Sequence, residues 1–268
     1  MGVVNVTPDS FFDGGRYFDA KAAIDHGYEL IGEGADLLDI GGESTRPGAA
    51  PVPEDEELRR VLPVVAALAP LVRVSIDTMK PRVAEAAIGR GATLVNDVSN
   101  TLAAVAGAAG VGYVVMHMQG TPRDMQRAPT YDDVVADVSS MLAAGADAAR
   151  AAGVDEVYVD PGIGFGKTLA HNLALLRALP ELVAAGVPVL VGTSRKSFLG
   201  RINRNGGASL PPQDRLEGSL ATAVWAATCG AAIVRVHDVG PTLLAMRLLE
   251  DRPEATDGHG RVRAEVVR

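Results

Sequence analysis

Residues that can bind charged or heterocyclic ligands recur along this sequence, nearly every time at the carboxyl-terminal edge of a short apolar run. Carboxylates and amides can pair with the edge of a heterocycle, while Arg, Lys and His suit phosphate groups. These residues are Asn5, Asp39, Asp77, Asn96 with Asp97, His117, Asp160, Arg195 with Lys196, and Arg235 with His237. The pattern predicts a polar ligand site built by several elements together.

The apolar runs that carry these residues at their carboxyl-terminal edges are short and rich in Val, Ile and Leu, as buried parallel strands are. They are Gly2–Val6, Leu37–Ile40, Val72–Ile76, Thr93–Val95, Gly112–Met116, Glu156–Val159, Pro188–Val191 and Ala232–Val236. A (β/α)₈ barrel builds its active site where the carboxyl ends of successive strands meet. The spacing therefore predicts an α/β fold of this type, a TIM barrel, with the site at that end.

Stretches with helical periodicity separate the predicted strands, and alternation of this kind is typical of a parallel α/β fold. The predicted helices are Ala20–Gly34, Glu54–Ala69, Pro81–Arg90, Asp132–Ala152, Asn172–Ala185, Arg215–Thr228 and Pro241–Leu249, with a weaker Ala-rich candidate at Thr101–Ala109. Glu54 opens an acidic first turn and Pro81 stands at a helix start, both of which favour these boundaries.

The length of 268 residues fits one barrel, although two smaller domains would also fit. We expect a single domain over residues 1–250 and a loosely packed polar tail over residues 251–268. Hydrophobic residues make up 47% of the chain and aromatic residues only 4%, so aliphatic side chains must fill the core.

The net charge of −8 argues against general nucleic-acid binding, which needs a basic face, but a local basic cluster can still bind an anion. The single cysteine, Cys229, excludes an internal disulfide and a multi-cysteine zinc site, and its apolar neighbours predict a buried structural thiol. No apolar run approaches the ~18 residues of a membrane span, so we expect a cytoplasmic protein without membrane contact.

Eight segments in order, from Met1 to about Leu249, resemble the dihydropteroate synthase family of the folate pathway. They are Met1–Gly15, Asp39–Gly48, Ser75–Thr78, Asn96–Val98, Met116–Gly120, Asp160–Thr168, Gly192–Ser197 and Arg235–Val239. The resemblance implies a sulfonamide-sensitive transferase of the TIM-barrel class. Such an enzyme joins 6-hydroxymethyl-7,8-dihydropterin diphosphate to p-aminobenzoate, giving 7,8-dihydropteroate and pyrophosphate.

The resemblance further implies a pterin pocket. Its expected residues are Asp160, Asp77, Asn96, Lys196, Met116 and Phe165. The Asp160 carboxylate would accept two hydrogen bonds from the amino-pyrimidinone edge, and Lys196 would donate to a pterin oxygen or ring nitrogen. The alternative for Asp160 is a purely structural role, because Asp-Pro-Gly favours a turn in any protein.

A diphosphate pocket is implied at Arg235, His237, Asn5 and Arg46. Arg235 and His237 alternate around Val236, so both are expected to point the same way. A divalent ion, expected to be Mg²⁺, would bridge diphosphate oxygens with Asn5 as its protein contact, since Mg²⁺ often keeps waters and relies on phosphates. The alternative for His237 is a structural histidine at a strand end.

Two long loops after the first two strands are expected to bind p-aminobenzoate. The implied contacts are Phe11, Asp13, Thr45, Arg46, Pro47 and Ser197. Glycines would let these loops close over the substrates, although their polarity also fits solvated surface. The family further implies a homodimer.

Catalysis would rest on Lys196, Arg235, His237 and Asp77. Breaking the C–O bond to diphosphate leaves a pterin methylene cation, and cationic groups stabilise the departing diphosphate. The sequence shows no obvious Ser–His or Cys–His pair, and this route needs no enzyme nucleophile.

Three other interpretations depend on specific features. Gly162–Thr168 is close to a nucleotide phosphate loop, but Pro161 stands where that pattern requires Gly. A related methyltetrahydrofolate methyltransferase domain would share the pterin carboxylates but would not need Arg235, His237 or the Thr45–Gly48 segment. A noncatalytic ligand-binding relative would have lost residues from the loops or the diphosphate pocket.

Overall fold

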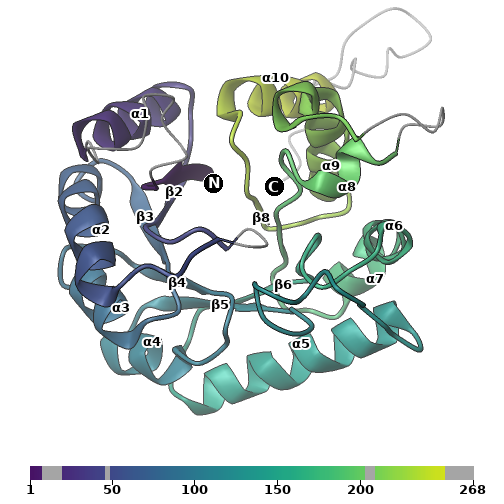
Figure 1. Ribbon diagram of the computed structural model, residues 1–268, viewed down its shortest axis with the longest axis horizontal. Coiled ribbons are helices and arrows are strands. Elements are labelled where there is room, and N and C mark those ends of the chain that lie inside the picture. Colours follow the sequence, from purple (N-terminus) through teal and green to yellow (C-terminus); the bar gives the residue numbers. More distant parts are fainter. Residues whose placement is uncertain (8–19, 46–48, 203–208, 251–268) are drawn as a thin grey trace, which may run out of the picture.

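The computed structural model describes residues 1–7, 20–45, 49–202 and 209–250 of the chain. Within these residues strands and helices alternate, and the helices surround the strands (Figure 1). The strands are β1 Gly2–Asn5, β2 Leu37–Gly41, β3 Arg73–Asp77, β4 Leu94–Asp97, β5 Gly112–Met116, β6 Val157–Asp160, β7 Leu190–Val191 and β8 Ile233–Val234.

The helices occupy the intervals between the strands, as the periodicity predicted. They are α1 Ala20–Gly32, α2 Glu54–Leu68, α3 Pro81–Ile88, α4 Ala103–Ala109, α5 Val134–Ala151, α6 Leu169–Arg177, α7 Leu179–Ala184, α8 Ser197–Gly200, α9 Leu216–Thr228 and α10 Val239–Glu250. The 3₁₀ turn Pro212–Asp214 precedes α9.

The strands close into a ring, which confirms the predicted barrel. Strands β1 to β6 pair in chain order as one parallel sheet, and β7 pairs in parallel with β8. Single parallel bridges, Gly2 with Val236 and Val159 with Val189, join the two sheets. At these joints Val3 N donates to Val236 O and Val159 N donates to Pro188 O, each at 3.0 Å.

Aliphatic side chains fill the core, as the low aromatic content required. A small cluster inside the ring contains Leu37, Leu94, Val114 and Leu190, each at most 6% exposed. Three of the four are the first residues of their strands, so this cluster fills the amino-terminal end of the barrel. The carboxyl-terminal end is thereby left for polar side chains.

The single helix predicted over Asn172–Ala185 is wrong, because two helices occupy this region and meet at Ala178. Pro180 stands in the first turn of α7, where its missing N–H is tolerated, but it cannot continue α6. Thr168 caps α6 by accepting from His171 N at 3.2 Å, so this helix begins earlier than predicted.

Strands β7 and β8 are each only two residues long, shorter than predicted. Arg235 and His237 therefore follow β8 directly, while Val236 between them is buried, as the alternation required. The predicted polar tail, residues 251–268, lies outside the described residues. Within the described part of the chain, no helix is both long and apolar enough to cross a membrane.

Candidate functional site

Strands β1, β2 and β3 bring their last residues, and β4 its next-to-last residue, to one level at the carboxyl end of the barrel. Asn5 is in register with Gly41, Gly41 with Asp77, and Asp77 with Asn96. A Cβ at Gly41 would come within 3.3 Å of Asp77 Cβ, so glycine leaves space beside this carboxylate. Met116 is likewise in register with Asp160. These predicted site residues therefore share one rim.

Arg235 reaches across this rim to two carboxylates. Its Nε donates to Asp39 Oδ2 at 2.6 Å and its Nη2 donates to Asp77 Oδ2 at 3.1 Å. Burial lowers the pKa of Arg235, but the charges of Asp39 and Asp77 outweigh it and hold the pKa above its ordinary value. Arg235 is therefore a permanent cation in the partly enclosed site.

The carboxyl group of Asp77 is hard to ionise. Burial, followed by the negative charge of Asp39, raises the pKa of Asp77 to about 7, and the charge of Arg235 opposes this rise. Protonation of this predicted catalytic residue therefore changes in the neutral pH range.

Asp39 has a central place that the sequence did not reveal. Its side chain is fully buried, and its Oδ2 also accepts from Asn96 Nδ2 at 2.9 Å. The sequence placed it at the end of a strand, but the structure has it in the middle of β2, and its contacts with Asn96 and Arg235 could not be predicted. Asp39 Oδ1 and the neighbouring Ser75 Oγ are buried without a hydrogen-bond partner among the described residues.

Asp160 has the structural role considered for it and keeps one carboxylate oxygen outside the turn. Its Oδ1 accepts from Gly162 N at 2.7 Å, so it does stabilise the predicted turn. Its burial raises its pKa, while the nearby charge of Lys196 lowers it. The second oxygen, Oδ2, is not used by the turn, and the carboxylate lies beside the positive charge of Lys196.

The loop from Asp160 to Thr168 packs backbone against backbone on the end of β5. A Cβ on Gly162 would come within 1.8 Å of His117 O, and one on Gly166 within 2.5 Å of Gln119 O. Gly162, Gly164 and Gly166 all have positive φ angles, between 59° and 87°, which favour glycine. The glycines of the apparent phosphate loop are thus explained by close packing.

Lys167 holds this loop together from inside. Its side chain is almost completely buried, and Nζ donates to Gly162 O, Phe165 O and His117 Nδ1 at 2.9–3.0 Å. Burial, followed by the charge of Lys167, lowers the pKa of His117 to about 4, so His117 is a neutral acceptor. Lys167 therefore caps the loop and does not face an anion site.

Lys196 lies where the loops after β6 and β7 meet. Its Nζ donates to Ile163 O and lies 4.7 Å from the centre of the Phe165 ring. Burial lowers the pKa of Lys196 to about 8, whereas Asp160 raises it. The structure thus brings three predicted pterin residues together: Lys196, Phe165 and Asp160.

His237 is half-buried beside Ser194, a contact that the sequence did not reveal. Its backbone N donates to Ser194 Oγ at 3.1 Å, and its Nδ1 lies 3.0 Å from the same oxygen. The Ser194 hydroxyl is buried and bonded to the backbone, so the contact orients the imidazole. Arg195 turns to Asp238, to which its Nε donates at 2.8 Å, and is not part of this cluster.

Met116 and Asn5 occupy their predicted levels on the rim. Met116 is buried, and its backbone N and O bond to Asn100 Oδ1 and Nδ2 at 2.9 and 2.7 Å. Asn100 has a positive φ of 57°, so this clamp holds an unusual backbone conformation in the loop after β4. No pattern in the sequence pointed to Asn100.

Thr45 lines a cavity of about 360 Å³ between the loops after β2, β3 and β5. Its other lining residues are Glu43, Ser44, Ala49, Pro51, Met79, Thr121, Pro122 and Arg123. Lys80 pairs with both Glu43 and the fully buried Glu57, which ties the start of this loop to α2. Ser197 begins α8 and is exposed beside Lys196.

The remaining predictions have mixed outcomes. Phe11, Asp13, Arg46 and Pro47 lie outside the described residues. Cys229 was predicted to be buried, but it is only half-buried at the end of α9, although burial raises the pKa of its thiol. Among the described residues, no group of three or more His, Cys, Asp or Glu side chains could hold a metal ion.

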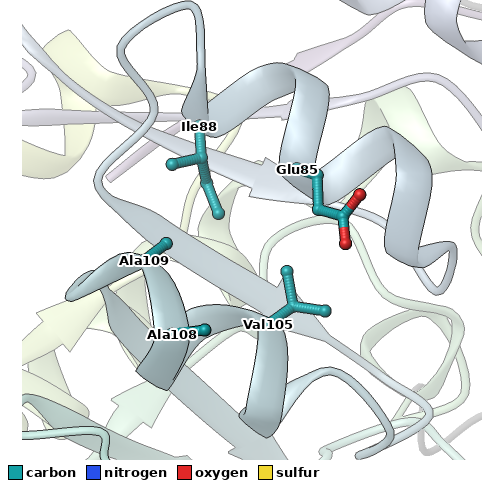
Figure 2. A pocket seen from close by; sticks show the side chains of 5 residues that line it. All are labelled: Glu85, Ile88, Val105, Ala108 and Ala109. Carbon is teal, nitrogen blue, oxygen red and sulfur yellow. The ribbon is translucent and has the colours of Figure 1, made fainter.

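A second cavity, of about 230 Å³, lies between α3 and α4, away from the strand ends. Figure 2 shows Ile88 and Glu85 on one side and Val105, Ala108 and Ala109 on the other. None of the predicted site residues lines this cavity. Its mostly apolar walls cannot bind a diphosphate.

The rim can therefore perform three tasks. Asp160, Asn96 and Lys196 offer acceptors and donors to a heterocycle edge. Arg235 and His237 can bind an anionic group. Asp39 and Asp77 keep Arg235 in position. The arrangement suits electrostatic stabilisation of a departing anion.

Known proteins resemble this chain over most of its length. The family model described as "pterin binding enzyme" matches residues 1–237. A dihydropteroate synthase from Mycobacterium leprae is 48% identical, covering 93% of this chain and 91% of that protein.

Solved structures agree with the sequence comparison. A Yersinia pestis dihydropteroate synthase with a sulfonamide drug has a TM-score of 0.86 at 46% identity, covering 93% of this chain and 92% of that one. A Xanthomonas albilineans dihydropteroate synthase in complex with 7,8-dihydropteroate has a TM-score of 0.82 at 44% identity, covering 93% and 91%.

Proposed function

The chain belongs to the pterin-binding enzyme family, within its dihydropteroate synthases, and from this premise we propose how its residues carry out the reaction. The enzyme is a transferase of folate biosynthesis. It condenses 6-hydroxymethyl-7,8-dihydropterin diphosphate with p-aminobenzoate. The carbon–oxygen bond to diphosphate breaks, a carbon–nitrogen bond forms, and the amine loses a proton.

The charged cluster at one end of the barrel is the observation that supports the roles proposed for individual residues. Arg235 contacts Asp39 and Asp77 while Lys196 lies near Asp160, so residues from β2, β3, β6 and the loops after β7 and β8 converge. A heterocycle with a charged leaving group needs both a polar edge and a cationic pocket, and this cluster provides them together.

The pterin binds to Asp160, Asn96 and Lys196 in this proposal. Asp160 accepts from the amino-pyrimidinone edge, and Lys196 donates to a ring oxygen or nitrogen. Met116 and Phe165 pack against the ring. The buried carboxylate of Asp160 is an effective acceptor because few water molecules compete for it.

Arg235, His237 and Asn5 hold the diphosphate. The guanidinium plane of Arg235 suits phosphate oxygens, and the side chain is already fixed by Asp39 and Asp77. Because this geometry exists before the substrate binds, little reorganisation accompanies departure of the diphosphate. Arg46, outside the described residues, is proposed as a further contact.

The residues at the rim fit a Mg²⁺ ion that is coordinated mainly by substrate oxygens. The described residues contain no carboxylate-rich metal cluster, but Asn5 ends β1 at the rim and offers a carbonyl oxygen, a ligand that Mg²⁺ accepts. When bound, the ion supplies positive charge at the diphosphate. Asn5 and the substrate oxygens would hold it.

p-Aminobenzoate is proposed to bind between Thr45, Ser197 and Phe165. Thr45 lines the cavity beside the rim, and Ser197 follows Lys196 directly. Phe11, Asp13 and Pro47 are proposed to complete this site. Closure of their loops would keep water from the pterin methylene cation until the amine attacks.

We also propose that the protein is a homodimer that uses the surface of α9 and α10. The two helices pack together, and their outer faces expose Trp225, Leu244 and Leu248, which are 43–71% exposed. Exposed apolar residues on neighbouring elements favour a protein contact. Light scattering of Leu244→Glu tests this, since a dimer through this face should dissociate while a dimer through another face should not.

The reaction itself is tested by incubating the purified protein with both substrates and Mg²⁺. The expected result is formation of equal amounts of 7,8-dihydropteroate and pyrophosphate, with loss of activity in EDTA and competition between a sulfonamide and p-aminobenzoate. Arg235→Met serves as the inactive control. Pterin binding without condensation would support a noncatalytic relative instead.

A further inference from the structure

The carboxylate of Asp39 contacts two proposed substrate-binding side chains from one layer below the rim. Asp39 stands two residues before Gly41, whose level carries Asn5, Asp77 and Asn96. The Asp39 side chain is 0% exposed, whereas that of Arg235 is 20% exposed. Asp39 is therefore out of reach of a ligand, whereas its partner Arg235 is accessible and its partner Asn96 keeps a small exposed area of 5%.

The chemistry of a carboxylate fixes the orientation of Asn96. An ionised carboxylate has acceptors only, whereas an amide has one donor end and one acceptor end. The end of Asn96 that faces Asp39 Oδ2 at 2.9 Å must therefore be its NH₂ group, and its carbonyl oxygen must point away. Without such a neighbour an asparagine can present either end.

The same carboxylate fixes the direction of Arg235. Nε is bonded to Asp39 on β2 and Nη2 to Asp77 on β3, so two strands hold the plane of the guanidinium. An arginine held at two nitrogens loses little conformational freedom when an anion binds.

We propose that Asp39 is a positioning residue that sets the hydrogen-bond specificity of the pterin pocket. By turning the NH₂ group of Asn96 inward it presents the carbonyl oxygen to the substrate, so the pocket selects heterocycles that offer an N–H there. By holding Nε of Arg235 it aims the other nitrogens at the leaving group. This inference rests on the proposed function of Asn96 and Arg235.

Ser75 provides a matched control. It is the register partner of Asp39 on the neighbouring strand and is equally buried, but its hydroxyl bonds to neither Asn96 nor Arg235. Ser75→Ala removes a polar group from the same layer without touching the proposed contacts. If any change in this layer disturbed the site, substitutions at both positions should weaken ligand binding. If Asp39 positions Asn96 and Arg235, only the substitution of Asp39 should weaken it.

The first test compares Asp39→Asn, Ser75→Ala and the double variant Asp39→Asn/Asn96→Asp. Calorimetric titration with 6-hydroxymethyl-7,8-dihydropterin diphosphate measures the Kd, and thermal melting checks folding. Asp39→Asn should weaken binding about tenfold or more, since the amide of Asn96 can then turn. Ser75→Ala should stay within about twofold of the wild type.

The double variant exchanges amide and carboxylate. The new amide at position 39 can donate to the new carboxylate at position 96, which keeps an acceptor toward the ligand. The double variant should therefore bind the diphosphate more tightly than Asp39→Asn alone, by about threefold or more, which is a coupling that independent sites do not show.

A second test uses pH. Asp77 is surrounded by Asp39, Glu57 and Asp97 and by the cations Arg235 and Lys196. Burial and then Asp39 raise the pKa of Asp77 to about 7. Asp39→Asn removes one of these negative charges, so the midpoint of the pH dependence of ligand binding should move to lower pH. Ser75→Ala removes no charge from this layer and should leave the midpoint unchanged.

The outcomes are distinguishable from failure of the proposed function. If the wild type condenses both substrates but Asp39→Asn binds within twofold of it, or the double variant binds no better than Asp39→Asn, this inference is overturned. Should Asp39→Asn fail to fold, the double variant alone tests the inference. A Kd within about tenfold of the wild-type value then supports the positioning role of Asp39, and weaker binding overturns it. A wild type without condensation contradicts the proposed function itself.

Discussion

The ammonium group of Lys196 lies over the ring of Phe165, 4.7 Å from its centre, and donates to the carbonyl oxygen of Ile163. Phe165 and Ile163 belong to the loop after β6, whereas Lys196 follows β7. The contact therefore joins two loops and holds the cation in place before a substrate binds.

Phe165→Leu should raise the KM for the pterin substrate about fivefold, because the cation loses the aromatic face that positions it. The KM for p-aminobenzoate should rise as well, since Phe165 is proposed to contact both substrates. Steady-state kinetics in both substrates measure the effect. Tyr28→Leu replaces an exposed aromatic residue on α1 and should change neither value. Equal kinetics for the wild type and Phe165→Leu would contradict the role of the ring.

Asp160→Asn should weaken pterin binding about 10- to 100-fold, because a charged acceptor becomes a neutral group that also carries a donor. The fold should persist, since the amide oxygen can still accept from Gly162 N, which Asp160 Oδ1 does at 2.7 Å. Titration calorimetry and thermal melting separate the two effects. Asp147→Asn, at an exposed position on α5, is the control. Unchanged pterin affinity would remove Asp160 from the site.

Activity should fall as the pH rises through about 8. Burial lowers the pKa of Lys196 to about 8, so above this value the side chain loses the charge proposed to bind the pterin. In Lys196→Arg the side chain keeps its charge at higher pH, so the alkaline limb of the kcat/KM profile should move to higher pH, whatever the maximal kcat/KM of the variant. An alkaline limb at the same pH in both proteins would assign that limb to another group.

The raised pKa of Asp77 should make its contribution to the free energy of unfolding decrease as the pH rises. Because burial raises its pKa to about 7, the folded protein holds a proton at Asp77 that the unfolded chain releases near its ordinary pKa of about 3.8. Between these two values the folded state binds more protons, so the contribution of Asp77 to stability falls as the pH rises. Urea unfolding at pH 5 and pH 7.5 should show a smaller loss for Asp77→Asn than for the wild type. A larger loss in the variant would contradict the sign.

Lys167→Met should destabilise the protein by about 2–4 kcal/mol, because carbonyl groups of the loop after β6 lose a buried donor. Its Nζ donates to Gly162 O at 3.0 Å and to Phe165 O at 2.9 Å. Urea unfolding measures the change in free energy. Lys21→Met on α1, where the lysine side chain is 77% exposed, should change stability by less than about 0.5 kcal/mol. Similar stability of Lys167→Met and the wild type would rule out the clamp.

The barrel and the strand ends could be predicted from the sequence because both depend on local pattern. Alternating apolar runs and helical stretches placed Asp77, Asn96 and Asp160 at the carboxyl ends of strands, where the structure has them. Pairing between distant residues could not be predicted. Asp39 and Arg235 are 196 positions apart, and only closure of the barrel brings them together.

The loop after β6 shows the same limit. Its sequence resembles a phosphate loop, and Pro161 argued against that interpretation, but the actual use of Lys167 depends on carbonyl groups that only the folded loop arranges. The split between α6 and α7 is different, because Pro180 was visible and its missing N–H is a local signal.

The central claim is that residues of separate strands form one substrate site at the carboxyl end of the barrel. A crystal structure with 6-hydroxymethyl-7,8-dihydropterin diphosphate and Mg²⁺ tests it most directly. The ring should bind at Asp160 and Asn96, with the diphosphate at Arg235 and His237. Density for the ligand in the cavity between α3 and α4, or with its phosphates remote from Arg235, would contradict the account.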